Sequence, residues 1–144
     1  MRAYATATRT LSAELQAEHG LTLNDLEALL LLSRAEGRRM KRVDLSRMLI
    51  LTPSGVTRLL EGLEEAGLVV RDTCASDRRV VYAVLTDAGA ARVEEASCGH
   101  TGSIRSLLEG HLTATEMEEL GAILGKLPGV LEAEDACSAL TERG

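Results

Sequence analysis

The stretch TPSGVTRLLEGLEEAGLVVRDTCASDRRVVYAVLTDAG, residues 52–89, decides the fold. Thr52 is a favourable N-cap, Pro53 suits the first position of a helix, and Gly67 suits its end. Between them, apolar residues repeat at the spacing of one helical face, namely Val56, Leu59, Leu60 and Leu63. The stretch therefore begins with an amphipathic helix whose opposite face is exposed.

Two strand-like runs follow this helix. LVVRD (68–72) and VVYAVL (80–85) are rich in β-branched residues, and the turn-rich segment TCASDRR (73–79) separates them. Before the helix, VDLSRMLIL (43–51) predicts a short helix with Leu45, Met48 and Leu49 on one side. Two short helices joined by a turn and followed by a hairpin form a winged helix-turn-helix.

Helices are expected on both sides of this motif. Residues 3–19 form a first helix, and a capping box of Thr22 and Asp25 opens a second that Gly37 ends. After the hairpin, helical sequence extends over 86–127, with a break expected near CGHTG (98–102) because glycine disfavours helix. A second capping box, Thr113 with Glu116, precedes one apolar stripe that ends at Pro128-Gly129 and consists of Met117, Leu120, Leu124 and Leu127. The fold class is mainly α with a small β-hairpin wing (α+β).

Composition limits the class of protein. With 144 residues, 45% hydrophobic and 26% charged, the chain suits one ordinary globular domain, and no apolar run approaches the roughly 20 residues of a membrane helix. The N-terminal sequence lacks the apolar centre of a secretory signal, so we expect a cytoplasmic protein. Only two aromatic residues are present, Tyr4 and Tyr82, which predicts an aliphatic core.

The net charge of −6 is unevenly distributed along the chain. From residue 34 to residue 79 there are ten basic and seven acidic residues, a balance of +3, which leaves −9 for the rest of the chain. In the second helix of the motif, Ser54 and Arg58 occupy the first turns of the exposed face, and Glu61 and Glu65 its far end. This polarity suits a helix that reads DNA bases with its first turns.

These residues resemble the MarR-type winged-helix transcriptional regulators. The resemblance runs from Leu45 to Gly89, where Asp77 and Arg79 match the Asp-x-Arg signature of the family's wing and Leu85-Thr86 its following Leu-Thr; Ile50 stands where the family often has glycine. It implies one domain over 1–144, with a DNA-binding lobe at 21–85 and helical dimerisation regions at 1–20 and 86–144. It further implies a homodimer on double-stranded DNA, with a ligand pocket between the lobe and the dimerisation helices.

The DNA-binding residues follow from this resemblance and from the exposed faces of the motif. Asp77 and Arg79 are expected to pair and shape the wing, while Arg78 or Arg79 enters the minor groove and the other meets phosphate. Ser54, Thr57 and Arg58 are expected at base edges or phosphate, Thr52 at a phosphate, and Gly55 at a close backbone approach. The expected contacts to the DNA backbone are Arg39, Lys41 and Arg42.

Other chemistry finds less support in the sequence. Cys98 and His100 match no strong zinc-ligand spacing, and we expect neither a metal nor a cofactor. Nothing pairs a nucleophile with a base at recognisable spacing, so no catalytic residue is predicted. Cys74 lies in the wing, where oxidation would disturb DNA contact, so a redox-responsive regulator is one alternative.

The leading hypothesis is a sequence-specific DNA-binding regulator, a repressor relieved by a small-molecule effector and acting as a homodimer. Two recognition helices one helical turn apart, about 10 bp, imply a pseudo-palindromic operator. The competing class is a winged-helix module that mediates protein contacts without binding DNA.

Overall fold

The structure is a computed structural model that describes residues 2–73 and 79–126, with side chains described from residue 6 onward. It divides into two compact units. Unit 2 comprises residues from His19 to Glu95, and unit 1 comprises residues up to Glu18 together with those from Ala96 onward. Asp77, Arg78, Cys74, Leu127 and the Pro128-Gly129 pair lie outside the described residues.

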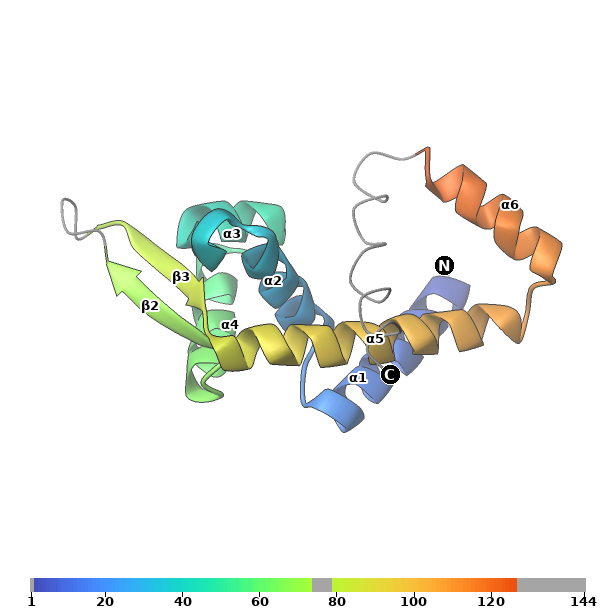
Figure 1. Cartoon of the computed structure of the whole chain (residues 1–144), viewed down its shortest axis with the longest axis horizontal. Coiled ribbons are helices and arrows are strands. Elements are labelled where there is room, and N and C mark those ends of the chain that lie inside the picture. Colours follow the sequence, from blue (N-terminus) through green and yellow to red (C-terminus); the bar gives the residue numbers. More distant parts are fainter. Residues whose placement is uncertain (1, 74–78, 127–144) are drawn as a thin grey trace. The chain divides into compact units, whose positions relative to one another are not determined.

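The described residues of unit 2 form α-helices and a small sheet (Figure 1). The helices are α2 (Leu23–Arg34), α3 (Arg42–Met48) and α4 (Pro53–Glu65), and the first part of α5 (Asp87–Glu109) also belongs here. The strands are β1 (Arg39–Lys41), β2 (Val69–Thr73) and β3 (Val81–Leu85), in the antiparallel order β1-β3-β2. The fold class expected from the sequence is thereby confirmed, as a winged helix-turn-helix.

The core of unit 2 is aliphatic, as expected. Its fully buried side chains of largest volume are leucines and valines: Leu29, Leu32, Leu45, Leu60, Val56 and Val69. The capping box of Thr22 and Asp25 is present, with a distance of 2.9 Å from the Thr22 nitrogen to Asp25 Oδ2. α2 ends at Arg34, three residues before Gly37, which instead has a φ of +63° within a short 3-10 turn (Glu36–Arg38).

The strand β1 was not predicted from the sequence, which gave a basic segment after Gly37 and no strand there. Arg39 pairs with Val84 and Lys41 with Tyr82, so β3 has a neighbour on each side. Met40 alternates with its charged neighbours and is less exposed than either of them. The wing is therefore the extension of a three-stranded sheet rather than an isolated hairpin.

Alternation along the strands gives this sheet two distinct faces. The inner face carries Val69, Ala83 and Leu85, which are buried, together with Arg71. The outer face carries Arg39, Asp72 and Tyr82, because Asp72 is registered with Tyr82 and Arg39 with Val84, two residues along β3. Consecutive residues of β2, Arg71 and Asp72, thus point to opposite faces.

A close junction joins the hairpin to α5. The Thr86 hydroxyl accepts from the Gly89 amide at 2.9 Å and lies 2.8 Å from the Gly67 carbonyl, so Thr86 begins α5 and ties it to the end of α4. A β-carbon on Gly89 would lie 2.2 Å from the Leu68 carbonyl oxygen. Only glycine fits at this position without moving the backbone.

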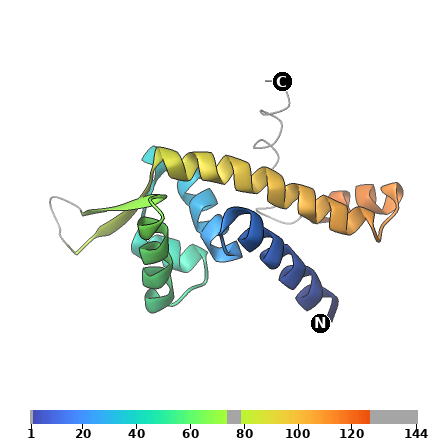
Figure 2. The ribbon, with the colours of Figure 1, turned by 90° about the horizontal axis from the view of Figure 1, so that it is seen from below.

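Unit 1 contains most of α1 (Arg2–His19), the later part of α5 and α6 (Ala114–Leu124). The expected break near residues 98–102 is wrong, because α5 continues through Gly99 and Gly102 to Glu109 (Figure 2). The capping box of Thr113 and Glu116 is present. In residues 2–73 and 79–126, no helix is long and apolar enough to cross a membrane.

One apolar position in the helix-turn-helix was assigned wrongly. Met48 was expected beside Leu45 and Leu49, but its side chain is 52% exposed, whereas both leucines are buried. The helix α3 is two turns long and contacts the core along one narrow seam, which the i, i+4 pair Leu45 and Leu49 fills. Met48 lies to the side of that seam.

Candidate nucleic-acid interface

The helix α4 begins with a side-chain cap that orients its first turn. Thr52 has extended backbone, and its hydroxyl accepts from the Gly55 amide at 3.1 Å. Pro53 has no amide hydrogen, so the first helical position leaves no amide without a hydrogen-bond partner. The remaining amide hydrogens and the helix dipole give this end a partial positive charge suited to a phosphate.

The two faces of α4 divide largely as the sequence predicted, although Leu59 of the predicted apolar face is only half-buried. Val56, Leu60 and Leu63 are buried, whereas Ser54 and Arg58 are exposed. The Thr57 hydroxyl donates to the Pro53 carbonyl at 2.8 Å. Its oxygen lone pairs therefore stay available to accept a hydrogen bond from a base or from water.

A shallow concavity of about 410 Å³ lies on this exposed face. Four of the predicted residues line it, Arg42 from α3 and Ser54, Thr57 and Arg58 from α4, and the lining is completed by Pro53 and Glu61. Two guanidinium groups, two hydroxyls and one carboxylate thus surround one hollow at the start of a helix. Such a set can contact phosphate through the arginines and base edges through the hydroxyls.

The turn between α3 and α4 is held by backbone and side-chain bonds. The Ser46 hydroxyl donates to the Leu51 carbonyl at 2.8 Å, and the Leu51 amide donates to the Ser46 carbonyl at 3.0 Å. Between them, Ile50 has a φ of +53° and a side chain that is 93% exposed. A β-branched residue in this left-handed conformation is strained, because its β-carbon crowds the backbone.

Arg39, predicted to contact the DNA backbone, is engaged within the sheet. Its guanidinium lies 3.2 Å from the Asp72 carboxylate and 4.1 Å from the centre of the Tyr82 ring. Arg38, the residue before it, forms an ion pair of 3.0 Å with Asp87 at the start of α5. Of the three predicted contacts to the DNA backbone, Arg39 is therefore engaged within the sheet. Arg42 instead lines the concavity beside α4, and Lys41 is exposed.

Arg71 contacts the helix of the candidate interface, and the sequence analysis assigned it no role. Its guanidinium lies 2.8 Å from Glu64 and 3.9 Å from Glu61, so it joins β2 to the acidic end of α4. The alternation of side chains along a strand could have indicated this position, because Arg71 lies on the same inward face of β2 as Val69. That position turns it towards the helix that precedes the strand.

The wing arginines are only partly described. Arg79 is exposed just before β3, whereas Asp77 and Arg78 lie outside the described residues. The expected pairing of Asp77 with Arg79 and the choice of arginine for the minor groove remain predictions. Cys74, the alternative redox residue, also lies outside them.

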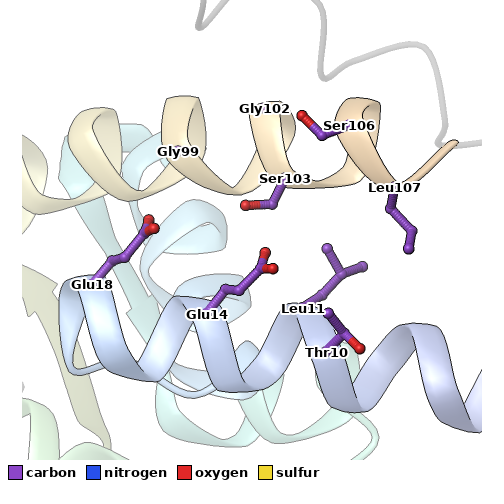
Figure 3. Close-up of a pocket in the computed structure, with 9 residues that line it drawn as sticks. All are labelled: Thr10, Leu11, Glu14, Glu18, Gly99, Gly102, Ser103, Ser106 and Leu107. Carbon is purple, nitrogen blue, oxygen red and sulfur yellow. The ribbon is translucent and has the colours of Figure 1, made fainter. Parts of the chain in front are cut away.

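Unit 1 contains a separate cavity of about 570 Å³ between α1 and α5. Figure 3 shows the Glu14 and Glu18 carboxylates directed from α1 towards α5, with Leu11 and Leu107 near the other end. The α5 side is formed by small residues, Gly99, Gly102, Ser103 and Ser106. The cavity therefore combines acidic, small and apolar surfaces.

His100 lies in the same unit in a partly buried environment. Burial lowers the pKa of its imidazole below the ordinary value of 6.5, and the charge of Glu14 opposes this shift. Its Nδ1 atom and the Ser97 hydroxyl are buried without a hydrogen-bond partner among the described residues. Protonating His100 would thus place a charge in poorly solvated surroundings.

Comparison with known proteins gives consistent matches. The sequence model of the MarR family matches residues 19–80. The transcriptional repressor YetL of Bacillus subtilis is 32% identical over 95 residues, which are 66% of this chain and 57% of that protein, so the match spans little more than half of the repressor.

Two solved structures from Streptomyces coelicolor match over most of the chain. The MarR family regulator AbsC is 33% identical with a TM-score of 0.68, and 85% of each chain is covered. The regulator Sco3205, solved in complex with DNA, is 28% identical with a TM-score of 0.70, and the match covers 85% of this chain and 79% of that one.

Proposed function

Because the chain belongs to the MarR family of transcriptional regulators, we propose that it binds double-stranded DNA sequence-specifically and represses transcription as a homodimer. The observation that carries this proposal is the concavity at the start of α4, where Arg42, Ser54, Thr57 and Arg58 meet. The similar regulator Sco3205 was solved with DNA, which supports the same partner here.

The proposed contacts divide into two kinds. Ser54, Thr57 and Arg58 read base edges in the major groove or contact the adjoining phosphates, and Thr52 and Gly55 set the helix start against the DNA backbone. Arg42 and Lys41 contact phosphate, and the wing contributes Arg79 or Arg78 to the minor groove. Arg39 contributes to the proposed DNA-binding surface indirectly, because it contacts Asp72 and Tyr82 within the sheet.

The homodimer places two such lobes on one pseudo-palindromic operator. Support comes from α6, where Ile123 and Leu124 expose large apolar side chains that a partner would cover. A C2 dimer presents its recognition helices about one helical turn of DNA apart.

Relief by a small molecule is the remaining part of the proposal. An effector that binds the dimer in the form unable to hold DNA would release the operator. The cavity of unit 1 supports a small-molecule site, since its volume of about 570 Å³ falls in the range that such ligands occupy.

Binding to DNA from upstream of the chain's own gene tests the proposal. Fluorescence anisotropy across a range of salt concentrations should give an affinity that falls steeply with salt, because bound phosphates release counterions. Arg58→Ala and Arg79→Ala should each weaken binding about fivefold or more, as the loss of a base or groove contact of about 1–3 kcal/mol requires.

Arg105→Ala is the matched control, because it removes one exposed arginine from unit 1 and should leave affinity nearly unchanged. Absent or salt-independent binding by a folded protein would contradict the proposal. That result would favour a winged-helix module for protein contacts.

A further inference from the structure

Two arginines hold the strand β2 from opposite faces of the sheet. On the outer face, Arg39 reaches from β1 across Tyr82 to Asp72, with distances of 4.1 Å to the ring centre and 3.2 Å to the carboxylate. On the inner face, Arg71 reaches to Glu64 of α4 at 2.8 Å. The anchors Asp72 and Arg71 are adjacent in the sequence and lie in β2, one and two residues before its last residue, Thr73.

We propose that Arg39 and Arg71 are positioning residues for DNA binding, which fix the direction of the wing relative to β1 and α4. We call these contacts the two-sided clamp: Arg39 with Tyr82 and Asp72 on one face, and Arg71 with Glu64 on the other. This proposal deepens the proposed function and rests on it only for the measurements made with DNA.

The contact of Arg39 with Asp72 suits this role because it crosses the middle strand of the sheet. β3 lies between β1 and β2, so a side chain that joins the two outer strands must span the middle one. Arg39 does so by lying over Tyr82, where its planar guanidinium combines a cation–π contact with an ion pair. A twist of β2 away from β3 would break the ion pair of Arg39 with Asp72, while the contact with Tyr82 holds the guanidinium over β3.

The inner contact suits the role because it joins the wing to the recognition helix itself. Arg71 neutralises part of the charge on Glu64 and Glu61, which lie towards the far end of α4. Without this contact, two carboxylates would face the DNA phosphates uncompensated and β2 would lose its tie to α4. The orientation of the wing relative to the recognition helix would then be less well fixed when the two enter neighbouring grooves.

Removing the acidic partners separates positioning from direct contact by the sign of the effect. Asp72→Asn deletes a negative charge and releases Arg39, so a directly contacting Arg39 would bind DNA more tightly. The two-sided clamp predicts the opposite, an affinity reduced about fivefold, with an unchanged slope against salt because no phosphate contact is lost. Glu64→Gln should weaken binding in the same way.

Asp44→Asn is the matched control. Its carboxylate pairs with Arg47 at 3.6 Å within α3, and its side chain is 50% exposed against 52% for Asp72. The control removes the same charge from the same unit without touching β2, and should leave affinity unchanged or slightly raised. In an Arg79→Ala background, Asp72→Asn should cause little further loss, because the clamp acts through the wing.

Hydrogen exchange of the free protein tests the clamp independently of DNA. Asp72→Asn and Glu64→Gln should speed exchange of the amides that pair β2 with β3, whereas Asp44→Asn should not. Unchanged exchange would overturn the clamp whether or not DNA binds. Faster exchange with tighter or unchanged DNA binding would overturn the positioning role, and wild-type protein that binds no DNA would refute the proposed function instead.

Discussion

At the scale of single residues, Ile50 shows most directly how the motif departs from an optimal sequence. It occupies a left-handed turn position with a φ of +53°, and its side chain makes almost no compensating contact because it is 93% exposed. The left-handed conformation costs a residue with a β-carbon about 1–2 kcal/mol, and glycine avoids this cost.

We therefore expect Ile50→Gly to raise the free energy of unfolding by about 0.5–1 kcal/mol, after allowing for the greater flexibility of glycine in the unfolded chain. Urea denaturation followed by circular dichroism measures the change. Met48→Gly, two residues earlier and also exposed, replaces the last residue of α3 and should lower stability instead, because glycine disfavours helical backbone. Equal effects of the two substitutions would contradict the role assigned to the positive φ.

Single residues also show what sequence reasoning can and cannot reach. Thr52, Pro53 and Gly67 act on the backbone within a few positions, so the bounds of α4 could be predicted from them. Arg42 and Arg58 could be assigned to one surface because helical periodicity fixes the exposed face. The partner of Arg39 lies 33 positions away, and no local pattern pointed to Asp72.

At the scale of elements, β1 and α5 differ from what their local sequences favour. β1 is a three-residue strand of two charged residues and a methionine, and it is a strand because β3 offers a pairing edge. α5 continues through Gly99 and Gly102 although each glycine disfavours helix by about 1 kcal/mol. For β1, pairing with a strand distant in sequence overrides the local preference.

The pairing of α5 with α1 in unit 1 gives this part of the chain a pH dependence. Because burial depresses the pKa of His100, the folded chain binds this proton less readily than the unfolded chain. The stability that neutral His100 contributes is complete above pH 6.5. This stability is lost as the pH falls below that value towards the depressed pKa of the folded chain. Glu14 faces the ring from α1 and limits the loss.

His100→Gln should therefore reduce the difference in the urea midpoint between about pH 7.5 and about pH 5.5. His111→Gln is the control, since it removes an exposed imidazole at the end of the same helix region and should retain the acid-induced loss. A wild-type midpoint that does not fall with acidification would contradict the assignment.

At the scale of the whole molecule, charge and apolar exposure are separated along the chain. The excess of basic residues lies between positions 34 and 79, within unit 2, and the acidic excess lies in the rest of the chain. Exposed aliphatic side chains on α6 belong to unit 1. This separation fits a protein that meets DNA with one unit and a second copy of itself with the other.

Ile123→Glu should accordingly weaken the proposed dimer, because it places a charge where an apolar partner surface is expected. Sedimentation velocity over a range of protein concentrations measures the shift towards monomer. Val43→Glu is the control in unit 2, with a similar starting exposure of 56% against 59% for Ile123. A stable dimer in the Ile123 variant would show that α6 does not contribute to self-association.

The tyrosine beneath Arg39 also makes the wing visible to optical spectroscopy. The chain has no tryptophan, and Tyr82 is one of only two aromatic residues. With Tyr4→Leu, all intrinsic ultraviolet fluorescence would come from a single ring stacked against a guanidinium 4.1 Å away. The protein thus contains its own fluorophore where Arg39 contacts Tyr82. Any event that separates the guanidinium from the ring can be followed as a change in emission without an added dye.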